Sequence, residues 1–306
     1  MTTKTTTTTS AGARSVKQLV AGYARIRTEL GKTIVGQGEV IEQILIAIFA
    51  GGHCLITGAP GLAKTLLVKS ISHILKLEFS RIQFTPDLMP ADITGTRLVV
   101  EDEHGGKRFA LHRGPVFSQV VLADEVNRAT PKTQSAMLEA MQERSVTVGG
   151  ETYALARPFF VMATQNPIEQ EGTYPLPEAQ IDRFMLKVVV DYPSREEELK
   201  VVDRIGSGKS VPVIQAVASP TDIIEARGVV DKIWADDKVR DYVVDLVRAT
   251  RDSQQSRAAG LEGMIELGAS PRASIYLMQA SRAHAFLQGR GYVTPHDVKS
   301  LALDVL

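Results

Sequence analysis

The fold is decided by the stretch Gly58-Ala59-Pro60-Gly61-Leu62-Ala63-Lys64-Thr65. A short apolar run, Cys54–Ile56, precedes it, and an amphipathic run, Leu66–Ile71, follows it. This order predicts a strand, a glycine-rich turn and a helix, in which backbone N–H groups and the positive end of the helix face one point. Lys64 would stand in the first helical turn, where its charge opposes the helix dipole, so we expect it to hold an anion. The spacing matches the phosphate-binding P-loop, G-x-x-x-x-G-K-[ST], with alanine in place of the last glycine.

Ala63 is the one departure from that motif. Alanine is the smallest step from glycine, and it fits the loop if its φ is negative. The alternative is an ordinary βα turn with a chance lysine. It would require the strand, both earlier glycines and Lys64-Thr65 to coincide by accident.

Length and composition limit the class of protein. The 306 residues suffice for a large core and two domains, and 35 basic residues balance 35 acidic ones, which argues against a general nucleic-acid or membrane surface. Cys54 is the only cysteine, so a disulfide framework is excluded and a reducing cytoplasm fits. The sequence has no apolar run of 18 residues, hence no predicted spanning helix. Residues 1–14 are Thr-rich and predict a disordered tail.

Polar side chains follow two further predicted strands. Val120–Ala123 reads as a buried strand and ends in Asp124-Glu125, and Phe159–Ala163 ends in Thr164-Gln165-Asn166-Pro167. Ligands of open α/β sheets bind beyond the carboxyl ends of the strands. With a P-loop upstream, these carboxylates and the Asn166 amide are therefore predicted to lie at the same site as Lys64.

Two segments predict β-hairpins inserted among the helices. Thr96–Val100 and Lys107–Leu111 read as strands around a polar link at 102–106. Val146–Val148 and Glu151–Leu155 flank Gly149-Gly150, which is a strong two-residue turn.

A boundary is predicted at Tyr192-Pro193-Ser194, beyond which the pattern is mainly helical. The predicted fold class is therefore α/β: a parallel sheet flanked by helices over 15–193, with two inserted β-hairpins, and a smaller all-α domain over 194–306. The expected helices of that smaller domain are 195–205, 220–230, 237–252, 271–287 and 295–306. The last has no stop signal, so we expect the C-terminus to be incomplete.

Taken together, the motifs resemble the MoxR family of AAA+ ATPases. The strings that carry the resemblance are Gly58–Thr65, Asp124–Ala129, Ala163–Pro167 and Asp182-Arg183-Phe184, and the match covers about 15–306. The resemblance implies an AAA+ P-loop core, a helix-2 insert, a pre-sensor-1 hairpin and a lid. It also implies a chaperone-like ATPase that forms a homo-oligomer, typically a hexameric ring. Such proteins act on a protein client with a von Willebrand factor A domain partner, in metalloenzyme maturation or complex assembly.

Residue chemistry and the resemblance together suggest roles at an ATP and Mg²⁺ site. Lys64 would neutralise the β- and γ-phosphates. The Thr65 hydroxyl and Asp124 would hold Mg²⁺, and Glu125 would be the general base that activates water. Asn166 would orient that water. The remaining nucleotide contacts would come from Gly58, Ala59, Pro60, Gly61, Leu62, Ala63, Leu66 and, at the adenine, Gln37.

Three arginines are expected to complete the electrostatics. Arg183 would be a finger that reaches the γ-phosphate of a neighbouring subunit; the alternative is a surface ion pair with Asp182 or Glu178. Arg272 stands at the wrong end of a predicted helix, which favours a phosphate contact of the sensor-2 kind; the alternative is an arginine that reaches back to an acidic loop. Arg128 is a candidate for a further contact between subunits.

Other functions remain open at this stage. The motor subunit of a magnesium chelatase and a DNA translocase belong to the same AAA+ branch, although the balanced charge weighs against DNA. A small-molecule kinase lacks an evident acceptor element, and a GTPase lacks an Asn-Lys-x-Asp motif. A scaffold that only binds ATP would lack the base that Glu125 supplies.

Overall fold

The computed structural model describes residues 8–101, 106–166, 173–206, 212–251 and 264–306. The start of the predicted tail, most of the polar link of the first hairpin, and Pro167 lie outside these ranges. The first helix, α1, spans Thr8–Thr33. It therefore includes the last seven residues of the predicted tail, 8–14, in the helix.

The centre of the molecule is a five-stranded parallel sheet in the order β2-β5-β8-β1-β9. The strands are β1 (Cys54–Gly58), β2 (Phe79–Gln83), β5 (Val120–Asp124), β8 (Phe160–Gln165) and β9 (Leu186–Val190). Alternation along β5 shows why the sheet is covered on both sides: Val120 and Leu122 belong to one apolar core, and Val121 and Ala123 belong to the other. The predicted buried strands and their shared carboxyl edge are confirmed.

Helices before and between the strands supply the two cores. The first core contains residues of α1, α2 and α3, and the second contains residues of α4, α5 and the second hairpin. These helices are α2 (Gly38–Ala50), α3 (Lys64–Ile74), α4 (Pro90–Thr94) and α5 (Pro131–Glu143), with the single-turn α6 (Glu178–Ile181) before β9.

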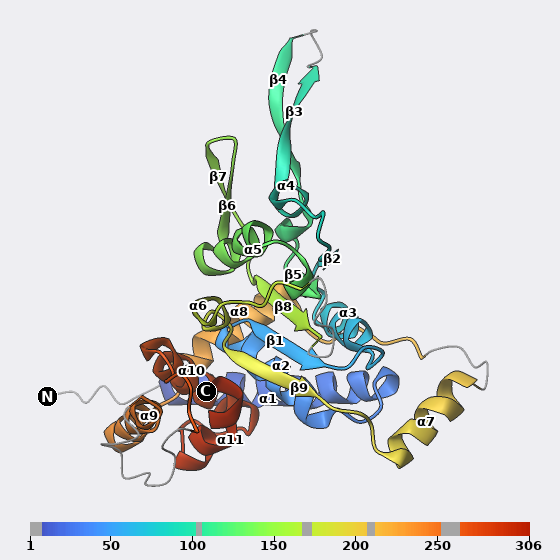
Figure 1. Ribbon diagram of the computed structural model, residues 1–306. Helices are drawn as coiled ribbons and strands as arrows, with labels where there is room; N and C mark the ends of the chain where they lie inside the picture. Colours follow the sequence, from blue (N-terminus) through green and yellow to red (C-terminus); the bar gives the residue numbers. More distant parts are fainter. Residues whose placement is uncertain (1–7, 102–105, 167–172, 207–211, 252–263) are drawn as a thin grey trace, which may run out of the picture.

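Both predicted hairpins are present and project from the same end of the molecule (Figure 1). They are β3 (Gly95–Glu101) with β4 (Lys107–Arg113), and β6 (Ser145–Val148) with β7 (Glu151–Ala154). Arg97 joins them: its guanidinium stacks over Phe109 at 5.1 Å, donates to the Gly149 carbonyl at 3.1 Å and pairs with Glu151 at 3.3 Å. The hairpins are therefore tied to each other.

The helices after β9 match the predicted all-α segment. They are α7 (Arg195–Gly206), α8 (Pro220–Val230), α9 (Asp237–Ala249), α10 (Pro271–Leu287) and α11 (Pro295–Val305). Their starts follow from capping: Ser219, Ser270 and Thr294 each accept a backbone N–H and precede a proline in the first turn. Phe286 of α10 packs against Phe49 of α2 with ring centroids 5.8 Å apart, so this domain and the sheet domain share an apolar core.

His53 is buried at the amino end of β1. Its Nδ1 accepts the Val161 N–H at 3.0 Å, so Nε2 carries the proton and donates to the Met141 carbonyl at 3.2 Å. Burial lowers the pKa of His53 from 6.5 to about 4. The ring is thus a neutral link between three chain segments.

This link predicts an acid-sensitive stability. The folded pKa of His53 lies below the unfolded value, so its contribution is fully present above about pH 6.5 and is lost as the pH falls towards 4. The full shift corresponds to about 3 kcal/mol in the free energy of unfolding. Urea unfolding of the wild type and of His53→Gln, whose amide offers the same acceptor and donor, measures this contribution. The difference between the two proteins should shrink between pH 6.5 and 4; a constant difference would contradict the assignment.

Candidate functional site

The P-loop takes its shape from two glycines and one strained alanine. A Cβ on Gly58 would collide with the Val190 carbonyl of β9, and Gly61 has a φ of +82°. Ala63 has a φ of 55° and a ψ of 23°, so the expectation of a negative φ is wrong. A left-handed residue costs about 1–2 kcal/mol without glycine. It turns the chain into the start of α3, so that consecutive N–H groups form a concave nest.

Lys64 lies at the bottom of this loop. Its Nζ donates to the Gly58 carbonyl at 2.7 Å. Burial lowers the pKa of Lys64, and the charges of Asp124 and Glu125 oppose that shift. The lysine therefore interacts electrostatically with both carboxylates. Together they border a cavity of about 340 Å³ lined by Pro60, Gly61, Leu62, Ala63, Lys64, Thr65, Arg81, Asp124, Glu125, Thr164 and Asn166.

Asp124 is held from both sides at the end of β5. Arg81 of β2 reaches its Oδ2 through Nε at 3.0 Å and Nη2 at 2.6 Å. The Thr164 hydroxyl of β8 donates to its Oδ1 at 2.5 Å and accepts the Glu125 N–H at 2.8 Å. These contacts fix the carboxylate at the shared edge of three adjacent strands, as the predicted strand ends require.

Glu125 leaves the strand in a left-handed conformation, with a φ of 57°. That turn directs its carboxylate to Gln83 Nε2 at 2.8 Å and to Arg128 Nη1 at 2.9 Å. Arg128 was a candidate for a contact between subunits, but the structure directs it to Glu125 of its own chain. Both partners donate hydrogen bonds to this carboxylate and so hold it at the edge of the cavity.

Arg81, Gln83 and Thr164 were not predicted as site residues. Arg81 and Gln83 lie in β2, which pairs with β5 in the register Gln83↔Asp124. Two polar residues near the carboxyl end of a strand were a usable signal, because that edge carries ligands. Assigning them partners required the strand order, which the sequence alone does not determine.

The oxygen atoms of this cavity suit Mg²⁺. Thr65 and Asp124 both line it and would supply a hydroxyl and a carboxylate, while Mg²⁺ characteristically takes one or two such ligands and completes its shell with water and phosphate. The ion would neutralise charge on the phosphates.

Gln37 contacts the loop from the start of α2. It has a φ of 55°, and its Nε2 donates to the Leu62 carbonyl at 3.3 Å. Next to it in sequence, Ile34, Val35 and Gly36 line a separate cavity of about 320 Å³, which Arg27 of α1 and Arg204 of α7 also line. The predicted adenine contact of Gln37 would be made where its side chain meets Leu62 of the P-loop.

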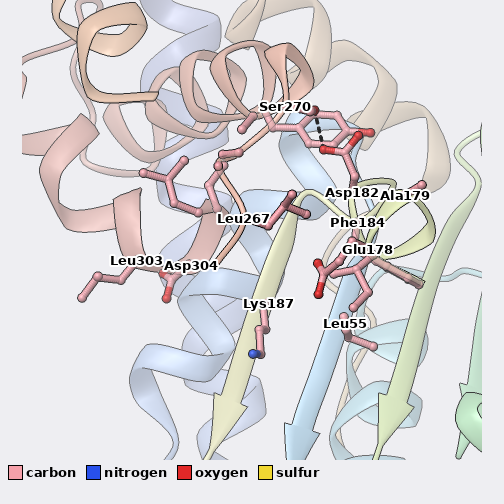
Figure 2. Close-up of a pocket in the computed structure, with 17 residues that line it drawn as sticks. Leu55, Glu178, Ala179, Asp182, Phe184, Lys187, Leu267, Ser270, Leu303 and Asp304 are labelled. Atoms are coloured by element: carbon pink, nitrogen blue, oxygen red, sulfur yellow. Dashed lines mark hydrogen bonds between the residues drawn. The ribbon is translucent and has the colours of Figure 1, made fainter. Parts of the chain in front are cut away.

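The other two predicted arginines lie in a different cavity. Arg183 and Arg272 line a space of about 290 Å³ with Gly51, Gly52 and His53. Arg272 pairs with Asp182 at 2.7 Å, as the alternative to a phosphate contact anticipated. Asp182 also bonds Ser270, and Figure 2 shows these two side chains facing each other beside a larger cavity of about 470 Å³ between β9 and the last helices.

The P-loop cavity and the cavity that contains Arg183 and Arg272, here called the arginine cavity, are at opposite ends of the sheet. β1 runs from Cys54, next to the arginine cavity, to Gly58, where the P-loop begins, and β9 runs beside it in parallel. Four residue steps along a strand span about 13 Å, and Arg183 precedes the first paired residue of β9 by three positions. The structure thus brings together Lys64, Thr65, Asp124, Glu125 and Asn166, and it separates Arg183 and Arg272 from them.

Comparison with known proteins agrees with this architecture. Residues 53–186 match the model of the ATPase family associated with various cellular activities (AAA), and residues 257–306 match the AAA lid domain. The crystal structure of a Cytophaga hutchinsonii protein superposes with a TM-score of 0.86 at 44% identity, covering 96% of this chain and 88% of that one.

Curated relatives extend the match over most of the chain. Chaperone MoxR1 of Mycobacterium tuberculosis is 44% identical over 295 residues, which is 96% of this chain and 77% of the relative. YeaC of Bacillus subtilis, which is uncharacterised, is 44% identical over 275 residues, covering 89% of this chain and 82% of the relative. MoxR of Paracoccus denitrificans is 31% identical over 308 residues, covering 93% and 88%. The chain therefore belongs to the MoxR family of AAA+ ATPases.

Proposed function

We propose that this protein hydrolyses ATP in a Mg²⁺-dependent reaction at a site shared between adjacent copies of the chain. The observation that carries the proposal is the separation of the P-loop cavity from Arg183 by the length of β1. An arginine side chain cannot cross that distance within one chain. A neighbouring copy that turns its arginine cavity towards the P-loop would complete the charge around the γ-phosphate.

Within the P-loop cavity each residue has a defined task. Lys64 holds the β- and γ-phosphates, and the N–H groups of the loop donate to their oxygens. Glu125 accepts a proton from the attacking water, which the Asn166 amide orients. Thr164 keeps Asp124 and the backbone of Glu125 in register. Gln83 and Arg128 hold the base until the water is in place.

A closed ring follows from such a head-to-tail contact. Each copy offers a P-loop on one side and an arginine on the other, so the interface is heterologous. Repeating such an interface around an axis gives a closed ring when the rotation between neighbouring copies divides a full turn evenly. Six copies are the number that the family resemblance implies. The linked hairpins project from the body and are the natural point of contact with a client.

We further propose a chaperone-like role with a von Willebrand factor A domain partner, in metalloenzyme maturation or complex assembly. The support is family membership and the name of the Mycobacterium tuberculosis relative, a chaperone. Family-level likeness sets this expectation, since functions vary on one fold. No helix within the described ranges has the length and apolarity needed to cross a bilayer.

Capture with a hydrolysis-blocked variant tests this function. Glu125→Gln, loaded with ATP and Mg²⁺, should form a ring by mass photometry and retain its partner and client through affinity purification. Lys64→Ala, which cannot hold the phosphates, is the control and should retain neither. Recovery of a von Willebrand factor A domain protein only with Glu125→Gln is the expected result. A variant that remains monomeric with bound ATP would contradict the ring.

A further inference from the structure

The arginine cavity contains a third cation that the ATPase roles above leave unused. Arg144 lines the cavity beside Arg183 and Arg272, and none of the described residues that line it is a carboxylate. Arg272 is neutralised by Asp182, which lies outside the lining. Neither Arg144 nor Arg183 forms an ion pair within the described ranges. Two arginines for which the described part of the chain supplies no acidic partner thus line the same cavity.

The backbone holds Arg144 in this place at a cost. The residue ends α5 in a left-handed conformation, with a φ of 52° and a ψ of 32°, and its carbonyl accepts the Leu155 N–H at 2.9 Å. A left-handed residue other than glycine is costly, and such strain concentrates at functional sites. Among the residues that the structure describes, the side chain makes one hydrogen bond, from Nη2 to the Gly51 carbonyl, at a long 3.3 Å. That bond leaves the other guanidinium donors for a ligand.

The residue packed behind Gly51 in the wall of the arginine cavity adds positive charge and does not neutralise the arginines. Arg227 of α8 donates from Nε to the Ile48 carbonyl at 2.8 Å and lies against Gly51. Its pKa is lowered to about 10, first by burial and then by the positive charge of Arg144, while Asp231 opposes the shift. The wall of the cavity is therefore cationic, which is the environment that an anionic ligand requires.

We infer that Arg144 binds phosphate oxygens of the nucleoside triphosphate held in the P-loop of an adjacent copy, together with Arg183. The inference rests on the shared site proposed above, since the cavity lies too far from the P-loop of its own chain. Arg144 is then a catalytic residue that acts across the subunit boundary. Two guanidinium groups approach the same phosphate from α5 and from the start of β9. Each supplies donors in the planar geometry that suits phosphate.

Charge removal without loss of the hydrogen bond is the sharpest test. Arg144→Gln keeps an amide donor for the Gly51 carbonyl, and Arg144→Lys keeps the charge. With Arg144→Gln, kcat should fall by roughly 10²-fold, the scale of losing one pre-organised donor to transition-state charge. The affinity for a fluorescent ATP analogue and the melting temperature should stay near wild type. Arg144→Lys should recover part of kcat. Arg240→Ala, which removes an exposed cation from α9, should change nothing.

Mixed assemblies then separate this inference from the shared site itself. Arg144→Gln mixed with Lys64→Ala should regain activity, because the first contributes an intact P-loop and the second an intact arginine cavity. Arg144→Gln mixed with Arg183→Ala should not, since every cavity lacks one arginine. If Arg183→Ala and Lys64→Ala rescue each other while Arg144→Gln has normal kcat or resists rescue, Arg144 is structural and only this inference fails. If the Arg183 pair also fails to rescue, the shared site fails.

Discussion

Glu125→Gln should lower the rate of ATP hydrolysis by about 10²–10⁴-fold and leave ATP binding near the wild-type level. The substitution replaces the proton-accepting carboxylate by an amide of the same size. An amide oxygen can still accept a hydrogen bond from Gln83 or Arg128, so the local geometry is preserved. Steady-state phosphate release and the binding of a fluorescent ATP analogue give the two quantities.

Glu139→Gln is the matched control, because Glu139 is an exposed carboxylate on α5 and lies outside the P-loop cavity. It should behave as wild type. Normal turnover in Glu125→Gln would remove this residue from the mechanism. Weak binding in the variant would instead point to an electrostatic role for Glu125 in holding the nucleotide.

Arg183→Ala should reduce hydrolysis by about 10³–10⁵-fold, the effect typical of a missing arginine finger. The P-loop cavity is untouched by this change, so ATP should bind as before. Mixing Arg183→Ala with Lys64→Ala should restore part of the activity. A complete site forms only at an interface between the two variants. There, the Arg183→Ala chain supplies an intact P-loop and the Lys64→Ala chain supplies Arg183. Activity measured across mixing ratios should pass through a maximum.

Two outcomes would count against action between copies. One is a mixture that forms common assemblies, as shown by differently tagged chains, but gains no activity. The other is an Arg183→Ala protein that hydrolyses ATP normally. Either result would assign catalysis to a single chain and would leave the long separation along β1 without a functional meaning.

Much of this fold was legible in the sequence because its signals are local. The P-loop string predicted the first strand and helix, and the helices predicted at 220–230, 271–287 and 295–306 begin where α8, α10 and α11 begin. The carboxylates after β5 and the amide after β8 met at one edge, since parallel strands share it.

What the sequence did not provide depends on contacts between distant segments. The left-handed backbone of Ala63 and Glu125 arises from the turn that each loop must make over the sheet. The pairing of Arg272 with Asp182 joins residues 90 positions apart. Gln83 reaches Glu125 only because β2 and β5 are neighbours in the sheet. Side-chain chemistry could identify candidates, but not their partners.

If the proposed shared site is correct, the helix α5 connects residues that act on two different nucleotides. Its first turn follows the short segment that carries Arg128, which donates to Glu125, the proposed general base, and its last residue is followed by Arg144. Thirteen helical residues form a rod of about 20 Å. A pull on one end therefore displaces the other without unfolding anything between them. Release of phosphate from the site of one copy would thus displace Glu125 of the adjacent copy. Such coupling favours sequential ATP hydrolysis around the proposed ring over hydrolysis in random order.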